Sequence, residues 1–371
     1  MKNVMKAFVF IMATVLLLSG CTTGNVIEET VDESVIDSIS DKVTDEATTA
    51  WERQTDGNTK DEAKNMWVFT RENGVSVRNV SIDIEGDNEE IEIIQITDPH
   101  LNYINEKDRE ENNSLVISSA RDCWLRDAAS LSKLQKCLEY GKASDQIVIT
   151  GDIFSYLSWG NLELVKKYIF DPYPTVMACL GNHDPLRSWN GAADESATVE
   201  ERMQILADNW IHDIYYYSKV INEKVMVVTL DNGSANGYGA FTAEQVTKLE
   251  NDLATAREKG YIVLLFYHIP ISTGNAKYYN TKATTIGDKN NSTANFYSNG
   301  INQYSPGASG EMYKLITSNA DIIKGCFSGH KHCDFYTEIN AKNADGTETV
   351  IPQYILIGAA YGANVLKITV K

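Results

Sequence analysis

The sequence predicts an α/β protein whose strands are divided between two sheets. A series of apolar runs of strand length, rich in β-branched residues, extends from residue 75 to the end of the chain. Patterns of helical period separate several of these runs. Strands that alternate with helices are typical of the α/β class, and so many strands favour two sheets over one.

The folded part of the chain is expected to begin near Met66, in the run MWVFTRE. The strands expected after it are, in chain order, VSVRNVSIDI, IEIIQIT, QIVIT, TVMACL, VMVVTL, YIVLLFY, IIKGCFS, VIPQYILIG and NVLKITVK. We therefore predict one folded domain over residues 66–371.

Helices are expected between several of the strands. They cover residues 115–140, 162–170, 198–210, 242–259 and 310–318. The fourth has the clearest ends, because Thr242 followed by Glu244 and Gln245 is typical of a helix N-terminus and Gly260 of a C-terminus. Cys123 and Cys137 would both lie on the first helix, too far apart to form a disulfide, so we expect buried thiols.

Residues 272–309 interrupt this alternation. They are rich in Asn, Thr, Ser, Gly and Tyr and show no sustained period. A stretch of this length without regular structure is uncommon inside a compact domain and usually forms a lid, a binding loop or a disordered segment. The tyrosines favour an ordered loop, so we predict a lid-like insertion.

Residues 1–20 have the features of a secretory signal peptide. Lys2 and Lys6 precede the apolar segment Ala7–Leu18, which is too short to cross a bilayer as a stable helix. The sequence LSGC that ends at Cys21 resembles the lipobox of bacterial lipoproteins. This resemblance implies cleavage before Cys21, a lipid on its sulfur, and an extracytoplasmic protein anchored to a bacterial membrane. The alternative is an ordinary secretory signal with an incidental cysteine.

Residues 21–65 are acidic and contain few large apolar side chains. Such a segment buries too little apolar surface to offset the entropy lost on ordering, so it is expected to be a flexible tether. The whole chain has a formal net charge of −18 at pH 7. An acidic surface repels phosphate polymers, so we expect no nucleic-acid partner.

Polar side chains follow five of the expected strands. Because the carboxyl ends of buried parallel strands share one crevice, these side chains are expected to meet. They are Asp98, His100, Asp152, Asn182, His183, Asp184, His268, His330 and His332. Oxygen and nitrogen donors without cysteine suit Zn, Mn, Fe or Ni. The remaining histidine, His212, lies at the end of an expected helix and is interpreted as structural.

The blocks occur in the order Asp-x-His, Gly-Asp, Gly-Asn-His-Asp, a single His and Gly-His-x-His. This order resembles the calcineurin-like metallophosphoesterase superfamily over residues 90–335. The resemblance implies a two-sheet β-sandwich flanked by helices, and a centre of two transition-metal ions. The metals implied are Mn, Fe, Zn or Ni.

The resemblance also assigns a role to each residue. It implies that one metal is bound by Asp98, His100, Asp152 and His332, and that Asp152 bridges to a second metal bound by Asn182, His268 and His330. His183 would face the substrate, and Asp184 would orient the His183 ring. Ser155 stands where purple acid phosphatases have a metal-binding tyrosine, and Tyr156 comes one position late, so no tyrosine–iron site is expected.

These roles imply a phosphoesterase that hydrolyses a phosphomonoester or a phosphodiester. A hydroxide that bridges the two metals would attack phosphorus directly, with His183 as acid or charge stabiliser. One alternative is a non-catalytic, lipid-anchored binding module on the same scaffold, and another is a metal-dependent hydrolase of a non-phosphate ester or amide.

A small phosphorylated molecule is the expected substrate, and the sequence leaves its identity open. Candidate substrate-binding residues are Arg187 in the loop after Asn182 and Tyr278 and Tyr279 in the insertion. Ordinary surface-loop roles are equally compatible with these three residues. The oligomeric state also stays open.

Overall fold

The computed structural model describes residues 68–84, 89–123, 128–233, 240–273, 278–279, 300–332, 334–343 and 345–371. The expected signal peptide, the lipidation site Cys21, the acidic tether and most of the insertion at 272–309 lie outside these residues. Within the described ranges, no helix has the length and apolarity that crossing a bilayer requires.

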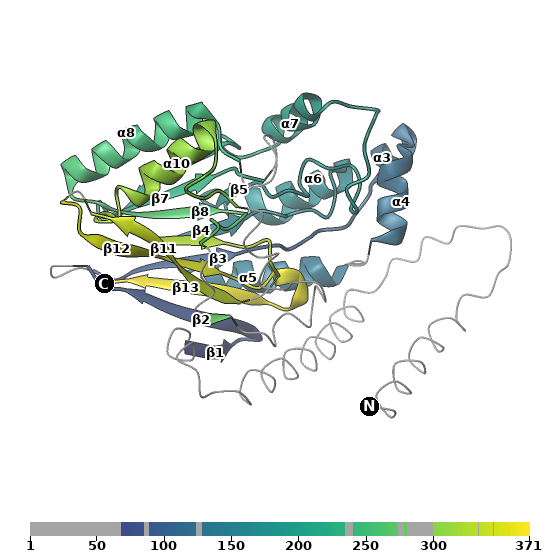
Figure 1. Ribbon diagram of the computed structural model, residues 1–371. Helices are drawn as coiled ribbons and strands as arrows, with labels where there is room; N and C mark the ends of the chain where they lie inside the picture. Colours follow the sequence, from purple (N-terminus) through teal and green to yellow (C-terminus); the bar gives the residue numbers. More distant parts are fainter. Residues whose placement is uncertain are drawn as a thin grey trace, which may run out of the picture. The chain divides into compact units, whose positions relative to one another are not determined.

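Two mixed sheets form the centre of the domain (Figure 1). The first contains, in spatial order, β1 (Val68–Glu72), β2 (Val75–Ile82), β13 (Asn364–Val370), β3 (Ile91–Ile96), β4 (Gln146–Thr150) and β5 (Met177–Cys179). The second contains β6 (Tyr216–Ile221), β7 (Val225–Leu230), β8 (Ile262–Tyr267), β10 (Ile323–Ser328), β12 (Glu348–Ile355), β11 (Phe335–Lys342) and β9 (Tyr278–Tyr279).

Helices accompany both sheets. They are α3 (Glu106–Glu111), α4 (Ser114–Asp122), α5 (Ala128–Gly141), α6 (Trp159–Val165) with a π-helical turn at Lys166–Phe170, α7 (Val199–Asp208), α8 (Ala243–Lys259), α10 (Gly307–Thr317) and the 3₁₀ turn η4 (Ala359–Tyr361). Figure 1 shows α8 and α10 over the second sheet. Leu134 and Leu138 of α5 belong to the apolar layer of the first sheet.

The alternation of side chains along each strand explains the layers. In β3, Ile93 packs between the two sheets, whereas Ile94 and Ile96 point to the helix side. Between the sheets, the rings of Phe266 and Phe327 stack with their centroids 4.8 Å apart. The predicted two-sheet β-sandwich flanked by helices is therefore confirmed.

The strands that precede the candidate site run parallel to one another. In the first sheet β3 pairs with β4 and β4 pairs with β5, both in parallel. In the second sheet β8 and β10 are also parallel neighbours. The carboxyl ends of these strands therefore open at one edge of each sheet, as the sequence pattern predicts.

The expected helix at 115–140 is wrong as a single element. The chain forms α4 and α5 there, and Cys123 ends α4 with an extended backbone at ψ 133°. The apolar spacing continues through this break, which is why the sequence suggests one helix. Within the described part of the chain Cys123, Cys137, Cys179 and Cys326 are buried, as expected for structural thiols.

The ends of α8 agree with the sequence. The Thr242 hydroxyl accepts a hydrogen bond from the backbone N–H of Gln245, and the Gln245 side chain accepts one from the backbone N–H of Thr242. Gly260 closes the helix at φ 73°, in the left-handed region that favours glycine.

Candidate metal centre

Backbone hydrogen bonds connect neighbouring loops within each sheet. In the first sheet, the amides of Asp98 and His100 donate to the carbonyls of Gly151 and Asp152, at 3.1 and 3.0 Å. In the second sheet, the amide of Gly329 donates to the carbonyl of His268 at 3.1 Å. These hydrogen bonds hold the loops, and the side chains that they carry, in fixed positions.

The first cluster of possible metal ligands consists of Asp98, His100, Asp152 and His332, whose ligand atoms all lie within 4.8 Å of one another. Nε2 of His332 lies 3.1 Å from Oδ1 of Asp98 and 3.0 Å from Nε2 of His100. Nε2 of His100 lies 3.7 Å from Oδ2 of Asp152. Two carboxylates and two imidazoles thus point to one place.

The second cluster consists of Asp152, His268 and His330. Nε2 of His268 lies 3.2 Å from Oδ2 of Asp152 and 3.2 Å from Oδ1 of Asn182. Asp152 belongs to both clusters. The donor set of nitrogen and oxygen atoms, with one carboxylate in common, fits a centre of two transition-metal ions.

Two of the imidazoles have a partner on the ring nitrogen that faces away from the cluster. Nδ1 of His268 donates to the carbonyl of Thr150 at 2.9 Å, and Nδ1 of His332 lies 2.7 Å from the hydroxyl of Tyr361. Such partners fix the tautomer and orientation of a metal-binding histidine. The arrangement directs Nε2 of both rings to the centre.

The backbone of the candidate ligands is strained. Asp98, His100, Asp152, His330 and His332 all have φ between 47° and 68°. This left-handed region is uncommon for residues other than glycine, and it costs roughly 1–3 kcal/mol each. Strain of this kind persists at sites where a side-chain position matters more than local stability, so it supports a functional role for these loops.

Gly181 and Gly329 each allow a neighbouring loop to approach closely. A Cβ on Gly181 would overlap the backbone nitrogen and Oδ1 of Asp152, and a Cβ on Gly329 would overlap Oγ1 of Thr97 and Oδ2 of Asp98. The motifs therefore have glycine at both positions because a larger side chain would overlap the neighbouring carboxylate.

Burial keeps two of the imidazoles neutral. It lowers the pKa of His100 to about 3 and the pKa of His330 well below its usual range. Neutral imidazole is the form that binds metal, so both rings can bind a metal ion at neutral pH without losing a proton.

The two carboxylates stay charged although they are buried. Burial alone would raise their pKa values, but the hydrogen bond from His332 lowers the pKa of Asp98 to about 2, and the charge of His268 lowers that of Asp152 well below its usual range. Burial opposes the proton on His268, yet the Asp152 carboxylate raises the pKa of His268 to about 9. In the metal-free protein this pair holds a proton where a cation would bind.

His183 lies at the same edge but makes different contacts. Its backbone N–H donates to Oδ1 of Asp152 at 2.8 Å, and its Nδ1 lies 3.1 Å from the carbonyl of Ser155. The ring meets that of His100 edge-on, with centroids 5.2 Å apart. Because a carbonyl only accepts, Nδ1 carries the proton and Nε2 is left for another partner.

The expectation that Asp184 orients the His183 ring is wrong. The Asp184 carboxylate accepts hydrogen bonds from the backbone N–H groups of Phe154 at 2.9 Å and Gly181 at 2.6 Å. The carbonyl of Ser155 is the ring's partner instead. Asp184 therefore ties together the loops that carry Asp152 and Asn182.

The candidate substrate residues lie in the loop after Asn182 and in β9. Arg187 is buried, and its Nη1 lies 3.9 Å from the carboxylate of Glu111 in α3. Tyr278 and Tyr279 form β9 and pair with β11. The Tyr156 hydroxyl donates to Oδ1 of Asn102 at 2.6 Å.

His212 has a structural role, as the sequence suggested. Its Nε2 accepts a hydrogen bond from the backbone N–H of Ala178 at 3.0 Å, at the free edge of β5, and its ring stacks on Tyr217.

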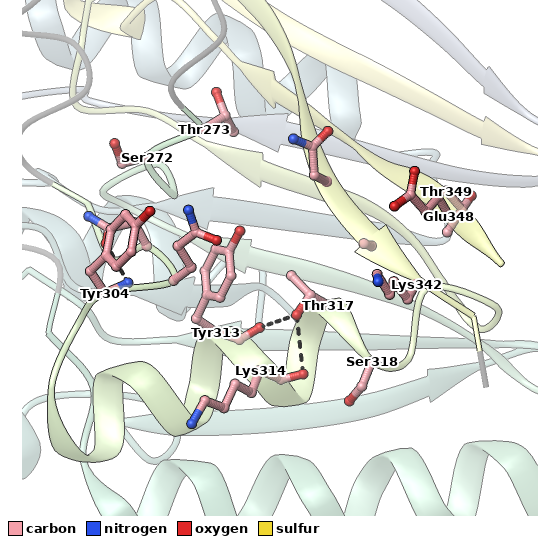
Figure 2. Close-up of a pocket in the computed structure, with 14 residues that line it drawn as sticks. Ser272, Thr273, Tyr304, Tyr313, Lys314, Thr317, Ser318, Lys342, Glu348 and Thr349 are labelled. Atoms are coloured by element: carbon pink, nitrogen blue, oxygen red, sulfur yellow. Dashed lines mark hydrogen bonds between the residues drawn. The ribbon is translucent and has the colours of Figure 1, made fainter. Parts of the chain in front are cut away.

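A cavity of about 800 Å³ lies elsewhere, at α10 and the β11–β12 hairpin (Figure 2). Tyr313 and Thr317 of α10 line it together with Lys342 of β11 and Glu348 of β12. None of the candidate metal ligands is among the described residues that line it. The cavity is therefore separate from the candidate metal centre.

Sequence reasoning missed Tyr361. It follows the strand run VIPQYILIG and a glycine, which is the same pattern that pointed to the histidine loops. A phenol is a less common partner of a metal site than an imidazole or a carboxylate, so the sequence alone does not distinguish Tyr361 from other tyrosines.

Comparison with known proteins identifies a family for this chain. The model of the calcineurin-like phosphoesterase family matches residues 91–334. The comparison with curated proteins gave no match. Similar solved structures include a dimetal phosphatase from Danio rerio, with 12% identity, TM-score 0.40, and coverage of 73% of this chain and 88% of that one. A purple acid phosphatase from yellow lupin seeds shows 13% identity and TM-score 0.41, over 77% of this chain and 46% of that one.

Similarity at this level says nothing about substrate. The family match spans the larger part of the chain and includes all five blocks that carry the candidate ligands. This chain therefore belongs to the calcineurin-like phosphoesterase family.

Proposed function

We propose that the protein is a phosphoesterase with two transition-metal ions, acting on a small phosphomonoester or phosphodiester. The observation that supports this most directly is the position of Asp152, which belongs to both ligand clusters. A carboxylate common to two sites holds two cations close together, as two-metal hydrolases require.

The residues that would hold the ions fall into two groups. Asp98, His100, Asp152 and His332 would hold one, and Asp152, Asn182, His268 and His330 the other. When bound, the two ions would supply Lewis acidity toward water and the phosphoryl oxygens. Mn, Fe, Zn and Ni all suit this donor set.

His183 is the residue placed to assist the leaving group. Hydrolysis adds water to phosphorus and breaks the bond between phosphorus and the ester oxygen, so that oxygen requires a proton. The Ser155 carbonyl holds the proton on Nδ1, which leaves Nε2 to exchange a proton with the substrate. The ring is only partly buried, so a bound ester could reach it.

The N-terminal segment suggests where the reaction occurs. Lys2 and Lys6, the apolar segment Ala7–Leu18 and the LSGC sequence have the order and spacing of a bacterial lipoprotein signal. We therefore propose that the protein is anchored outside the cytoplasm by a lipid on Cys21, with residues 21–65 as a spacer.

The test is turnover of two aryl phosphates, one with a single aryl group and one with two, each with Mn²⁺, Zn²⁺ or Mg²⁺. We expect metal-dependent hydrolysis of at least one, and the ratio of the two rates gives the preference for mono- or diesters. Asp152→Asn should abolish it, whereas Asp208→Asn, an exposed change on α7, should not. A metal-loaded protein that hydrolyses neither ester would contradict the proposal.

A further inference from the structure

The turn between β12 and β13 contacts two residues of the first ligand cluster, although it lies beyond the segment that the family model matches. The Tyr361 hydroxyl lies 2.7 Å from Nδ1 of His332, with the two ring centroids 5.1 Å apart. The backbone N–H groups of Ala359 and Ala360 donate to the carbonyls of Thr97, at 2.7 Å, and Asp98, at 3.2 Å. One turn thus contacts both His332 and Asp98.

The turn is itself held by a buried polar circuit. The Asn364 side-chain N–H donates to the carbonyls of Gly358 and Gly362, both at 3.2 Å. Its oxygen accepts from Nη1 of Arg78 at 2.8 Å. Arg78 is fully buried, and its Nε and Nη2 donate to Oδ2 of Asp334 at 3.0 and 2.9 Å.

Asp334 connects these hydrogen bonds to the loop that carries His332. It lies two residues after His332, and its Oδ1 accepts from the backbone N–H of Ile357 at 3.1 Å. A buried arginine with its carboxylate and amide partners in place is rigid, because breaking one contact leaves a buried charge uncompensated. The loop and the turn are therefore joined by one network of buried hydrogen bonds.

We propose that Tyr361 is a positioning residue for the metal ligand His332. Nε2 of His332 can bind a cation only when the ring proton is on Nδ1, and a phenol oxygen 2.7 Å away accepts that proton. Tyr361 would then hold the ring in the plane that directs Nε2 to the cluster. The role concerns the cluster of Asp98, His100 and His332, and not the one formed by His268 and His330.

The experiment compares Tyr361→Phe with Tyr216→Phe in the full-length protein. Both changes remove one hydroxyl, and Tyr216 is a matched control because its hydroxyl bonds to Asp252, outside both clusters. Zn²⁺ binding is measured by competition with a chelator of known affinity, and Co²⁺ absorption reports the ligand field. In Tyr361→Phe we expect one of the two sites to weaken by about 10- to 100-fold, with a changed Co²⁺ spectrum.

The second site and the unfolding midpoint of the metal-free protein are expected to match Tyr216→Phe. Unchanged Zn²⁺ affinity at both sites in Tyr361→Phe would overturn the role of Tyr361. Equal weakening of both sites with a lower unfolding midpoint would also overturn it, because it indicates a role in the fold alone. The inference rests on the proposed metal centre, which fails separately if the unaltered protein binds no Zn²⁺ or Co²⁺.

Discussion

The Nε2 atoms of His100 and His332 lie 3.0 Å apart, although the residues are 232 positions apart in the chain. Both rings are also directed to the carboxylate of Asp98, at 3.8 and 3.1 Å. Two imidazole lone pairs at this distance repel each other unless a proton or a cation lies between them. A ring proton donated from one Nε2 to the other, or a cation bound by both rings, relieves this repulsion.

The first prediction concerns metal stoichiometry. We expect the purified protein to bind two transition-metal ions per chain, measured by elemental analysis after reconstitution and desalting. Asp152→Asn should weaken both sites, because this carboxylate belongs to both clusters, whereas His332→Ala should weaken mainly one. A correctly folded protein that retains no metal would refute the assignment of these residues.

The second prediction concerns His183. His183→Asn should retain both metals but lower turnover by roughly 10²- to 10⁴-fold, the range for removing a positioned acid. The loss should be smaller for a nitrophenyl ester, whose leaving group needs no proton, if the ring acts as an acid. It should be the same for all leaving groups if the ring stabilises charge on phosphorus.

The matched control for this change is His212→Asn. His212 bonds to the edge of β5, so its loss should lower the unfolding midpoint and leave turnover unchanged in the folded protein. Full turnover in His183→Asn, at equal metal content, would remove His183 from the mechanism.

The third prediction concerns Asp184. Asp184→Asn should lower the free energy of unfolding by about 1–3 kcal/mol, because the amide has one acceptor for the two backbone N–H groups that the carboxylate now binds. Urea unfolding of the metal-free protein measures this loss. Asp208→Asn, on the exposed side of α7, should change it by less than about 0.5 kcal/mol. Equal stability of the two variants would show that the buried bonds contribute nothing.

The fourth prediction concerns pH. The pKa of His268 rises from 6.5 to about 9 on folding, so its stabilising effect in the metal-free protein is complete below pH 6.5 and is lost as pH rises through 9. Metal must displace this proton, so metal affinity should increase with pH over the same range. Calorimetric titration at pH 7.5 in buffers of different ionisation enthalpy should show about one proton released at this site. Heat that does not depend on the buffer would contradict it.

The fifth prediction concerns Cys21. We expect Cys21→Ser to move the protein from the membrane to the soluble fraction in a bacterial host, because no other residue of the leader can accept the lipid thioether. Fractionation followed by immunoblotting measures the change, and Cys179→Ser, a change at a buried thiol, is the control. Equal membrane association of Cys21→Ser and the unaltered protein would mean that another anchor exists.

The sequence predicts most of the strands, because strands depend on local patterns, but it does not predict β6, β11 or the order of the strands in each sheet. Alternating or continuous apolar runs indicate the strands, and polar residues directly after five of the runs indicate the loops that carry the candidate ligands. The position of Asp184 could not be predicted in this way. Its partners, Phe154 and Gly181, offer backbone N–H groups whose direction depends on how the loops pack.

Contacts between segments that are far apart in the chain could not be predicted from the sequence either. Arg78 lies 256 positions from Asp334, and nothing in the run VSVRNVSIDI distinguishes a buried arginine from an exposed one. The break at Cys123 was missed for a different reason, because helical spacing of apolar residues continues across it.

The left-handed backbone of Asp98, His100, Asp152, His330 and His332 has a consequence for laboratory evolution. Glycine adopts this conformation without strain, so exchanging any of the five for glycine relieves local strain and removes a ligand in one step. A screen that selects heat resistance alone, without substrate, would therefore favour variants with an impaired site. Selection for a more robust catalyst has to include turnover in every round.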